Sequence, residues 1–269
     1  MSNTLFIGKV LHRFEELPST NDWAAETLSK TKPPEGTVVR ADNQTDGRGQ
    51  LGSHWHSAAG ENLLLSIILY PTWLEAQAQF YLSMAVALAL RDTIGIRNAE
   101  CGMRNHARQI PHSPFRIPHS IKWPNDLYLH DKKTAGILIQ NTLVGSCLQS
   151  AIIGIGLNVN QTTFPPDLPH ATSLALAFGQ KLDLDEVAER LFECLEQRYL
   201  QLKAGHRSAI KAEYEQHLWR RGQPSRFVRS SDGSELSGII LGVTEQGLLR
   251  VEMERGVEDF ELKQLKFVL

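Results

Sequence analysis

The chain has 269 residues, of which 42% are hydrophobic and 22% charged, and its formal net charge is -2. This length and hydrophobic content allow one large core, or a core with a small second domain. The near-neutral charge argues against a protein that depends on duplex DNA, which usually carries a basic excess. The N-terminus lacks the apolar run of a signal peptide, and no stretch approaches the roughly 20 apolar residues of a membrane span.

The cysteines indicate a reducing compartment. Cys101, Cys147 and Cys194 are odd in number and far apart in the chain. They form no CxxC pair, so a disulfide framework or a zinc ribbon is not expected. The sequence therefore predicts reduced thiols in a cytoplasmic protein.

The first part of the chain is predicted to alternate strands and helices. Residues 5–14 alternate loosely between apolar and polar side chains, which favours a strand. Ser19 or Thr20 can cap a helix that continues to residue 30. Two buried strands and a helix with an apolar stripe follow, at 37–44, 62–70 and 75–91.

Residues 98–119 interrupt this pattern. The segment is polar, holds three prolines and shows no clear period. The tetrapeptide IPHS starts at Ile110 and again at Ile117, a repeat too short to indicate a solenoid. We interpret the segment as an inserted surface loop.

The next part predicts an antiparallel meander followed by two helices. Short apolar segments separated by polar turns predict four strands, at 120–123, 126–130, 134–141 and 151–160. Residues 183–203 have apolar side chains at helical spacing and end near Gly205, and residues 208–219 predict another helix.

The composition changes at Gly222-Gln223-Pro224. Beyond it lie short strand-like segments at close spacing, with turns at Asp232-Gly233 and Gln246-Gly247. We therefore expect two domains, residues 1–221 and residues 222–269. The second is too small to be very stable alone and should pack against the first.

Four motifs combine glycine with polar or charged residues, and each has an ordinary structural interpretation. The Ser-Thr-Asn at 19–21 fits a helix cap, and QTDGRGQLGSHW at 44–55 fits a turn. Lys122 of KWPND lies in an alternating strand, where a lysine usually faces solvent. The glycines of GIGLNVN at 154–160 can permit close packing.

In combination and in this order, the motifs resemble the biotin–protein ligases, which attach biotin to a lysine of carboxylase carrier domains. The most specific feature is KWPND followed by KTAGIL (Lys133 to Leu138), with the GRG loop upstream. The resemblance covers about residues 5–220, and more weakly the C-terminal part. It implies an α+β fold with a mixed, mainly antiparallel sheet flanked by helices on one side, like class II aminoacyl-tRNA synthetases. A small SH3-like β-barrel is expected to follow.

The resemblance also implies a two-step reaction. The biotin carboxylate attacks the α-phosphate of ATP and gives biotinyl-5'-AMP and pyrophosphate. The lysine amine of an apo biotin carboxyl carrier domain then displaces AMP; acetyl-CoA carboxylase or a related carboxylase is the expected source of that domain. Mg²⁺ is expected with ATP because the triphosphate must be neutralised.

The resemblance assigns roles to individual residues. Lys122 and Arg48 match the catalytic positions, where positive charge meets the carboxylate and the phosphate. Positions matched to biotin binding supply polar groups or close backbone approach, and they are Ser19, Thr20, Asn21, Gln44, Gly47, Arg48, Gly49, Gln50, Lys133, Gly136, Gly154 and Gly156. Positions matched to nucleotide binding are Arg48, Trp55, Lys122, Asn125, Asp126 and Asn158. The loop at 44–55 is expected to be mobile when free and ordered over the adenylate.

Two features depart from well-known relatives. Several relatives carry arginines at the places of Gln50, Leu51 and Ser53, so the sequence predicts weaker retention of biotinyl-AMP. Some relatives begin with a DNA-binding winged helix-turn-helix, for which a Ser-Thr-Asn motif at residue 19 leaves no room. We therefore expect a monofunctional ligase that binds no nucleic acid. Sheet-edge dimerisation occurs in parts of the family, and the sequence leaves the oligomeric state open.

Three other interpretations remain. A lipoate–protein ligase or acyltransferase shares the fold, although KWPND and the GRG loop favour biotin. A non-catalytic biotin-binding protein would not need Lys122, Arg48 and Lys133 together. A structural or interaction protein would require the motifs to be fortuitous. His54 and His56 do not predict a metal site, because no acidic or cysteine partner recurs at ligand spacing.

Overall fold

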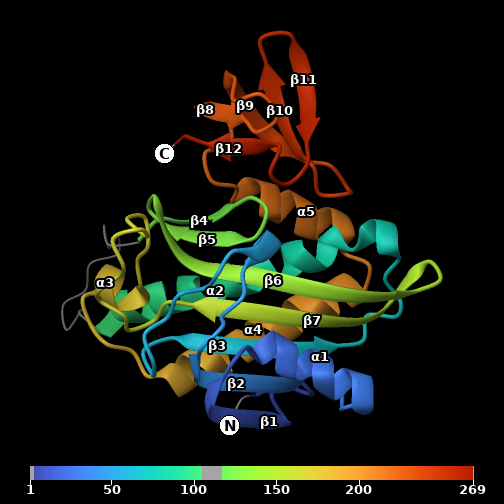
Figure 1. Cartoon of the computed structure of the whole chain (residues 1–269), viewed down its shortest axis with the longest axis vertical. Helices are drawn as coiled ribbons and strands as arrows, with labels where there is room; N and C mark the ends of the chain where they lie inside the picture. The colour runs from blue at the N-terminus through green and yellow to red at the C-terminus, as the bar shows by residue number, and fades with distance from the viewer. Residues whose placement is uncertain (1–2, 105–116, 269) are drawn as a thin grey trace.

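A seven-stranded sheet forms the centre of the protein (Figure 1). The computed structural model describes residues 3–104 and 117–268. The strands are β1 (Leu11–Leu17), β2 (Thr37–Gln44), β3 (Leu63–Leu69), β4 (His119–Lys122), β5 (Asp126–Leu129), β6 (Lys132–Val144) and β7 (Cys147–Leu157). Their order in the sheet is β1-β2-β3-β7-β6-β5-β4. β1 and β2 are parallel, and the other neighbours are antiparallel.

Helices cover both faces of this sheet. They are α1 (Thr20–Lys30), α2 (Phe80–Arg104), α3 (Leu174–Phe178), α4 (Leu184–Lys203) and α5 (Arg207–Gln216). Figure 1 shows α2 and α4 behind the sheet and α1 in front of it. Because side chains alternate along a strand, Leu65 and Ile67 of β3 join the large core behind. Ile68 instead packs near Ala24 of α1, so the expectation that all helices lie on one side is wrong for α1.

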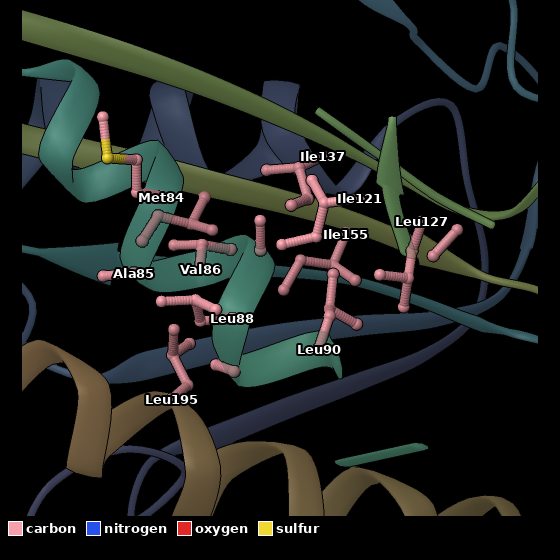
Figure 2. Packing of buried hydrophobic residues seen from close by; sticks show 14 of the residues in the cluster. Met84, Ala85, Val86, Leu88, Leu90, Ile121, Leu127, Ile137, Ile155 and Leu195 are labelled. Carbon is pink, nitrogen blue, oxygen red and sulfur yellow. The ribbon is translucent and has the colours of Figure 1, made fainter. Parts of the chain in front are cut away.

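The large core is built between the sheet and α2. Figure 2 shows Leu90 of α2 beside Ile155 of β7, with Met84 and Leu88 farther along α2 and Leu195 of α4 near Leu88. These side chains are almost completely buried. Burial of each large aliphatic side chain stabilises the fold by about 1.5–3 kcal/mol. This core makes the sheet a rigid support for whatever binds to its other face.

The structure corrects the boundaries expected around residues 75–119. A 3₁₀ turn, η2 (Ala76–Ala78), comes first, and α2 then extends to Arg104. Residues 98–104 are therefore helical rather than loop, because good helix formers such as Ala99 and Met103 allow α2 to propagate. His119 already belongs to β4, and the rest of the expected loop, 105–116, lies outside the described residues.

The N-terminal segment is also placed by tertiary contacts. A strand was expected at 5–14, but β1 begins at Leu11. The backbone N–H groups of Leu5, Phe6 and Ile7 instead donate to the carboxylate of Glu196 on α4, at 2.5, 2.8 and 3.0 Å. A buried carboxylate that accepts several N–H groups holds the segment against α4.

The C-terminal residues form a second, five-stranded antiparallel sheet. Its strands are β8 (Pro224–Arg229), β9 (Glu235–Val243), β10 (Leu249–Met253), β11 (Gly256–Phe260) and β12 (Leu265–Phe267). Their order is β11-β10-β9-β8-β12. A mixed sheet with helices followed by a small antiparallel sheet confirms the expected α+β class; a domain boundary at 221/222 stays a prediction.

The small sheet is packed firmly against the rest of the protein. Phe227 and Val243 belong to the same apolar cluster as the large core. The indole nitrogen of Trp123 donates to the carbonyl of Gly247 at 2.9 Å, and Glu215 of α5 accepts from the backbone of Val243 at 3.0 Å. Within the described residues, no helix is long and apolar enough to cross a membrane.

Candidate active site

A cavity of about 480 Å³ lies on the face of the sheet that α1 covers. Parts of α1, the loop after β2, the β4–β5 turn, β6, β7 and the end of the small sheet surround it. The residues expected at the site that line it are Ser19, Thr20, Asn21, Gln44, Arg48, Gly49, Gln50, Trp55, Lys122, Asn125, Asp126, Lys133, Gly136, Gly154 and Gly156. The fold thus brings segments that are far apart in the chain to one place.

Gly47 and Asn158 lie outside this lining. The carbonyl of Gly47 accepts from the backbone of Trp55 at 2.8 Å, within the base of the loop. The side chain of Asn158 is buried, and its Nδ2 donates to the carbonyl of Thr172 at 3.0 Å. Its Oδ1 has no hydrogen-bond partner among the described residues. Asn158 can therefore reach a ligand only if its surroundings move.

One end of the cavity holds a network of polar groups. Gln44 Oε1 accepts from the backbone N–H of Thr20 at 2.7 Å and from its hydroxyl at 3.0 Å. Ser66 Oγ on β3 lies 2.8 Å from Thr20 Oγ1 and 2.5 Å from Asn21 Oδ1. Within the described residues, Asn21 Nδ2 is buried without a partner. The network leaves one fixed donor for a ligand, since a buried amide normally finds an acceptor.

Glycines form the floor of the cavity. A Cβ on Gly154 would lie 2.3 Å from Asn21 Oδ1, and one on Gly156 would lie 2.4 Å from Trp55 Cε2. A Cβ on Gly136 would lie 2.9 Å from Trp55 Cζ3. Strands β6 and β7 therefore need glycine at these positions, where the polar network and the Trp55 indole approach the backbone.

The loop after β2 has internal contacts and one ion pair to α1. Gly49 donates to the carbonyl of Ser53 at 2.6 Å, and Gln50–Gly52 form a 3₁₀ turn. Arg48 pairs with Asp22 of α1 at 2.9 Å, with both side chains more than a third exposed. Such an exposed pair is worth only about 1 kcal/mol or less, so a phosphate can compete for Arg48. Mobility of this loop stays a prediction.

Two lysines stand at the other end of the cavity. Lys133 Nζ pairs with Asp126 at 2.7 Å, and Lys122 Nζ donates to the hydroxyl of Tyr128 at 3.0 Å. Burial is the main cause that lowers the pKa of Lys122; Asp126 opposes this effect, while Lys133 and Arg220 add to it. The arrangement places positive charge where a carboxylate and a phosphate can meet.

The structure adds lining residues to those that the sequence gave individual roles, and several of them lie inside the four motifs. From the small sheet and the turn before it come Leu262, Lys263, Leu265, Lys266 and Phe267. From the main body come Ser53, His54, Leu65, Trp123, Pro124, Ile137, Leu138 and Ile155. Ser66 contacts Thr20, and the alternation along 62–70 could have placed it opposite Leu65 and Ile67. No local pattern could have indicated the small-sheet residues, because only packing between the two sheets brings them here.

Comparison with known proteins identifies the family. The model of the biotin/lipoate A/B protein ligase family matches residues 14–158. The bifunctional ligase/repressor BirA of Bacillus subtilis is 35% identical over 95% of this chain and 73% of its own length. The chain belongs to the biotin/lipoate A/B protein ligase family. Another member, the biotin–[acetyl-CoA-carboxylase] ligase of Mycobacterium tuberculosis, is 30% identical over 81% of this chain and 74% of its own.

Solved structures of the family agree with this fold. The biotin protein ligase from Aquifex aeolicus, determined in complex with biotin and ATP, has a TM-score of 0.76 and 25% identity. The alignment covers 97% of this chain and 99% of that one. It therefore includes the small sheet as well as the region matched by the family model.

Proposed function

We propose that this family member is an ATP-dependent ligase that activates biotin as biotinyl-5'-AMP and transfers it to a lysine of a biotin carboxyl carrier domain. The observation that carries the proposal is one cavity with a fixed polar network at one end and two lysines, Lys122 and Lys133, at the other. Biotin has the same polarity, with a ureido ring at one end and a carboxylate at the other. The likeness to the Aquifex aeolicus ligase supports the same assignment.

The polar network fits the ureido ring. Asn21 Nδ2 is the donor for the ureido oxygen. The Asn21 side chain is held by Ser66 Oγ, which also contacts Thr20. Gly154 and Gly156 leave room for the rings and tail above the sheet. In this orientation the carboxylate extends toward Lys122 and Lys133.

Activation of the carboxylate is a displacement at phosphorus. A carboxylate oxygen bonds to the α-phosphorus of ATP, and the bond to the pyrophosphate oxygen breaks, with the electron pair leaving on pyrophosphate. Lys122 and Lys133 reduce repulsion between the two anions and stabilise the charge on the transferring group. Arg48 becomes available for phosphate oxygens when it leaves Asp22.

Transfer uses the same cavity. The carrier lysine gives a proton to water, its nitrogen bonds to the acyl carbon, and the carbon–oxygen bond to AMP breaks with the electron pair leaving on AMP. The carrier of acetyl-CoA carboxylase is the proposed acceptor, in keeping with the name of the Mycobacterium tuberculosis relative. Gly154, Gly156 and Trp55 hold the acyl group in place. The carrier amine then needs to approach the acyl carbon from only one side.

The cavity fits Mg²⁺ only as an ion carried by ATP. Asp126 is the one carboxylate among the described residues that line it, and it is paired with Lys133. The described residues contain no cluster of three His, Cys, Asp or Glu side chains suited to a metal. Asp126 and the Asn125 side-chain oxygen would add one or two ligands to those from the phosphates. The ion would supply neutralisation of the triphosphate.

The decisive experiment mixes the purified protein with ATP, Mg²⁺, biotin and an apo carrier domain, and determines the mass of the carrier. A carrier heavier by one biotin is the expected result. Lipoate competes in a parallel reaction, because the family includes lipoate ligases. Lipoyl transfer would contradict the assigned acid, and biotin binding without transfer would indicate a sequestering protein.

Restoring charge to the loop should slow release of the adenylate. Gln50 lines the cavity where several relatives carry arginine, so Gln50→Arg adds a donor for phosphate. An exposed contact of about 1 kcal/mol corresponds to about fivefold slower dissociation of biotinyl-AMP. Gln50→Met, of similar length without charge, is the control. Equal dissociation rates for the two variants, followed by stopped-flow displacement, would contradict the prediction.

A further inference from the structure

The ammonium group of Lys122 lies among three aromatic rings. Its Nζ is 5.1 Å from the ring centre of Tyr128, 5.5 Å from that of Trp219 and 5.1 Å from that of Phe267. It also donates a hydrogen bond to the Tyr128 hydroxyl at 3.0 Å. We call Tyr128, Trp219 and Phe267 the aromatic cage. A cation within about 6 Å of a ring centre is attracted by the negative face of the ring, most strongly where water is excluded.

The cage joins three separate parts of the fold. Tyr128 lies on β5, Trp219 follows α5, and Phe267 belongs to β12 of the small sheet. The rings also contact each other: Tyr128 and Trp219 are 5.4 Å apart, and Trp219 and Phe267 are 5.5 Å apart. Phe267 is therefore the ring that the small sheet contributes to the cage.

The rings are themselves held in place. Trp219 is buried, and its indole nitrogen donates to Asp131 Oδ1 at 2.9 Å. Its backbone N–H donates to the carbonyl of Ile121, next to Lys122, at 2.8 Å. Phe267 packs edge-on against Phe227 of β8 at 5.2 Å. A rigid cage around a long, flexible lysine side chain restricts the positions of its ammonium group.

We propose that the aromatic cage fixes the Lys122 ammonium at the cavity wall, and that Phe267 makes this position depend on the docked small sheet. Phe267 is then a positioning residue for a catalytic lysine, and the inference rests on the proposed ligase function. The reason is geometric, because charge stabilisation in the transition state requires a cation that is already in place.

The pKa of Lys122 reports on the cage, because burial and nearby charges both affect it. Burial lowers the pKa of Lys122, Asp126 of β5 opposes this effect, and Lys133 of β6 and Arg220 add to it. Lys263 and Lys266 bring further positive charge from the small sheet. Loss of the Phe267 ring removes a cation–π contact, which lowers the pKa of Lys122, and admits water to the ammonium, which raises it. A change at Phe267 should therefore alter the titration of Lys122.

The test compares Phe267→Leu with Phe260→Leu in the full-length protein. Phe260 is a buried ring of the same small sheet that carries its own cation, Arg229, at 5.3 Å. Both variants weaken the small sheet, but only the first removes a ring from Lys122. The readouts are the rate of biotinyl-AMP formation, its pH profile in kcat/KM, and the pH dependence of Lys122 acetylation by acetic anhydride, followed by peptide mass spectrometry.

For Phe267→Leu we expect formation of biotinyl-AMP to be about tenfold slower at pH values below the alkaline fall in rate. A factor of about ten is the size expected for the loss of one cation–π contact that is shielded from water. We also expect the alkaline limb and the Lys122 acetylation curve to shift from their wild-type positions. The two curves should move together, because kcat/KM reports ionisations of the free enzyme. Phe260→Leu should leave both curves unchanged, and Phe267→Tyr should restore wild-type behaviour.

Three outcomes would overturn the inference: equal acetylation curves for the two leucine variants, a slower rate with an unchanged acetylation curve, or a shifted curve with an unchanged rate. In the last two cases Phe267 either acts elsewhere or does not position Lys122 for reaction. Acetylation does not require ligase activity. A wild-type protein that fails to biotinylate a carrier would therefore refute the proposed function separately from the cage.

Discussion

Lys122→Ala should slow formation of biotinyl-5'-AMP by about 10²- to 10³-fold, the usual effect of removing one group that stabilises charge in a transition state. Lys122 lines the cavity, and its neighbour Lys133 is already paired with Asp126. Without Lys122, the carboxylate and the α-phosphate approach each other with much less compensation. Pyrophosphate release in a single turnover, with saturating biotin and ATP, measures this step directly.

The control for this prediction is Lys132→Ala. Lys132 is an exposed lysine of β6, next to Lys133 in sequence and outside the cavity lining. It should retain the wild-type rate, and biotin affinity measured by calorimetry should change much less than the rate in both variants. Lys122→Arg should not restore activity, because a planar guanidinium differs in shape from the compact ammonium. A Lys122→Ala rate within about threefold of wild type would contradict the catalytic assignment.

Gly154→Ala should weaken biotin binding by about 10- to 100-fold. The new Cβ would lie 2.3 Å from Asn21 Oδ1, a distance that forces the side chain to move. Asn21 shares a network with Ser66 and Thr20, so its displacement misaligns the groups expected to hold the ureido ring. Loss of hydrogen bonds that leaves buried polar groups unsatisfied costs about 1–3 kcal/mol, which corresponds to this change in affinity.

Calorimetric titration with biotin, in the absence of ATP, measures the effect of Gly154→Ala. Gly95→Ala in α2 is the control, because its Cβ would meet His119 Nε2 at 3.4 Å, an ordinary contact distance. Alanine also favours the helix, so this variant should fold at least as well as wild type. Unchanged biotin affinity in Gly154→Ala would mean that biotin does not use the Asn21 end of the cavity.

The sequence by itself determined the family and much of the local structure. TVVRADNQ is apolar and β-branched at its start, and β2 spans the same residues, Thr37–Gln44. Ser19 accepts from the backbone of Asp22 and begins α1, as a cap requires. KWPND forms the tight turn of the β4–β5 hairpin, where Lys122 lies opposite Asp126. The KTAGIL segment of β6 then pairs with β5, with Gly136 opposite Asp126. These features depend on neighbours in sequence, so residue type and spacing are enough to predict them.

Tertiary structure alone decided what surrounds those residues. Trp219 and Phe267 contact Lys122 because the small sheet docks beside the main one, and a β-strand pattern contains no information about that docking. The same holds for Glu196, which fixes the N-terminal segment, and for α1, which lies on the site face of the sheet. In each case the free energy comes from contacts between elements, and only the packed fold places those elements together.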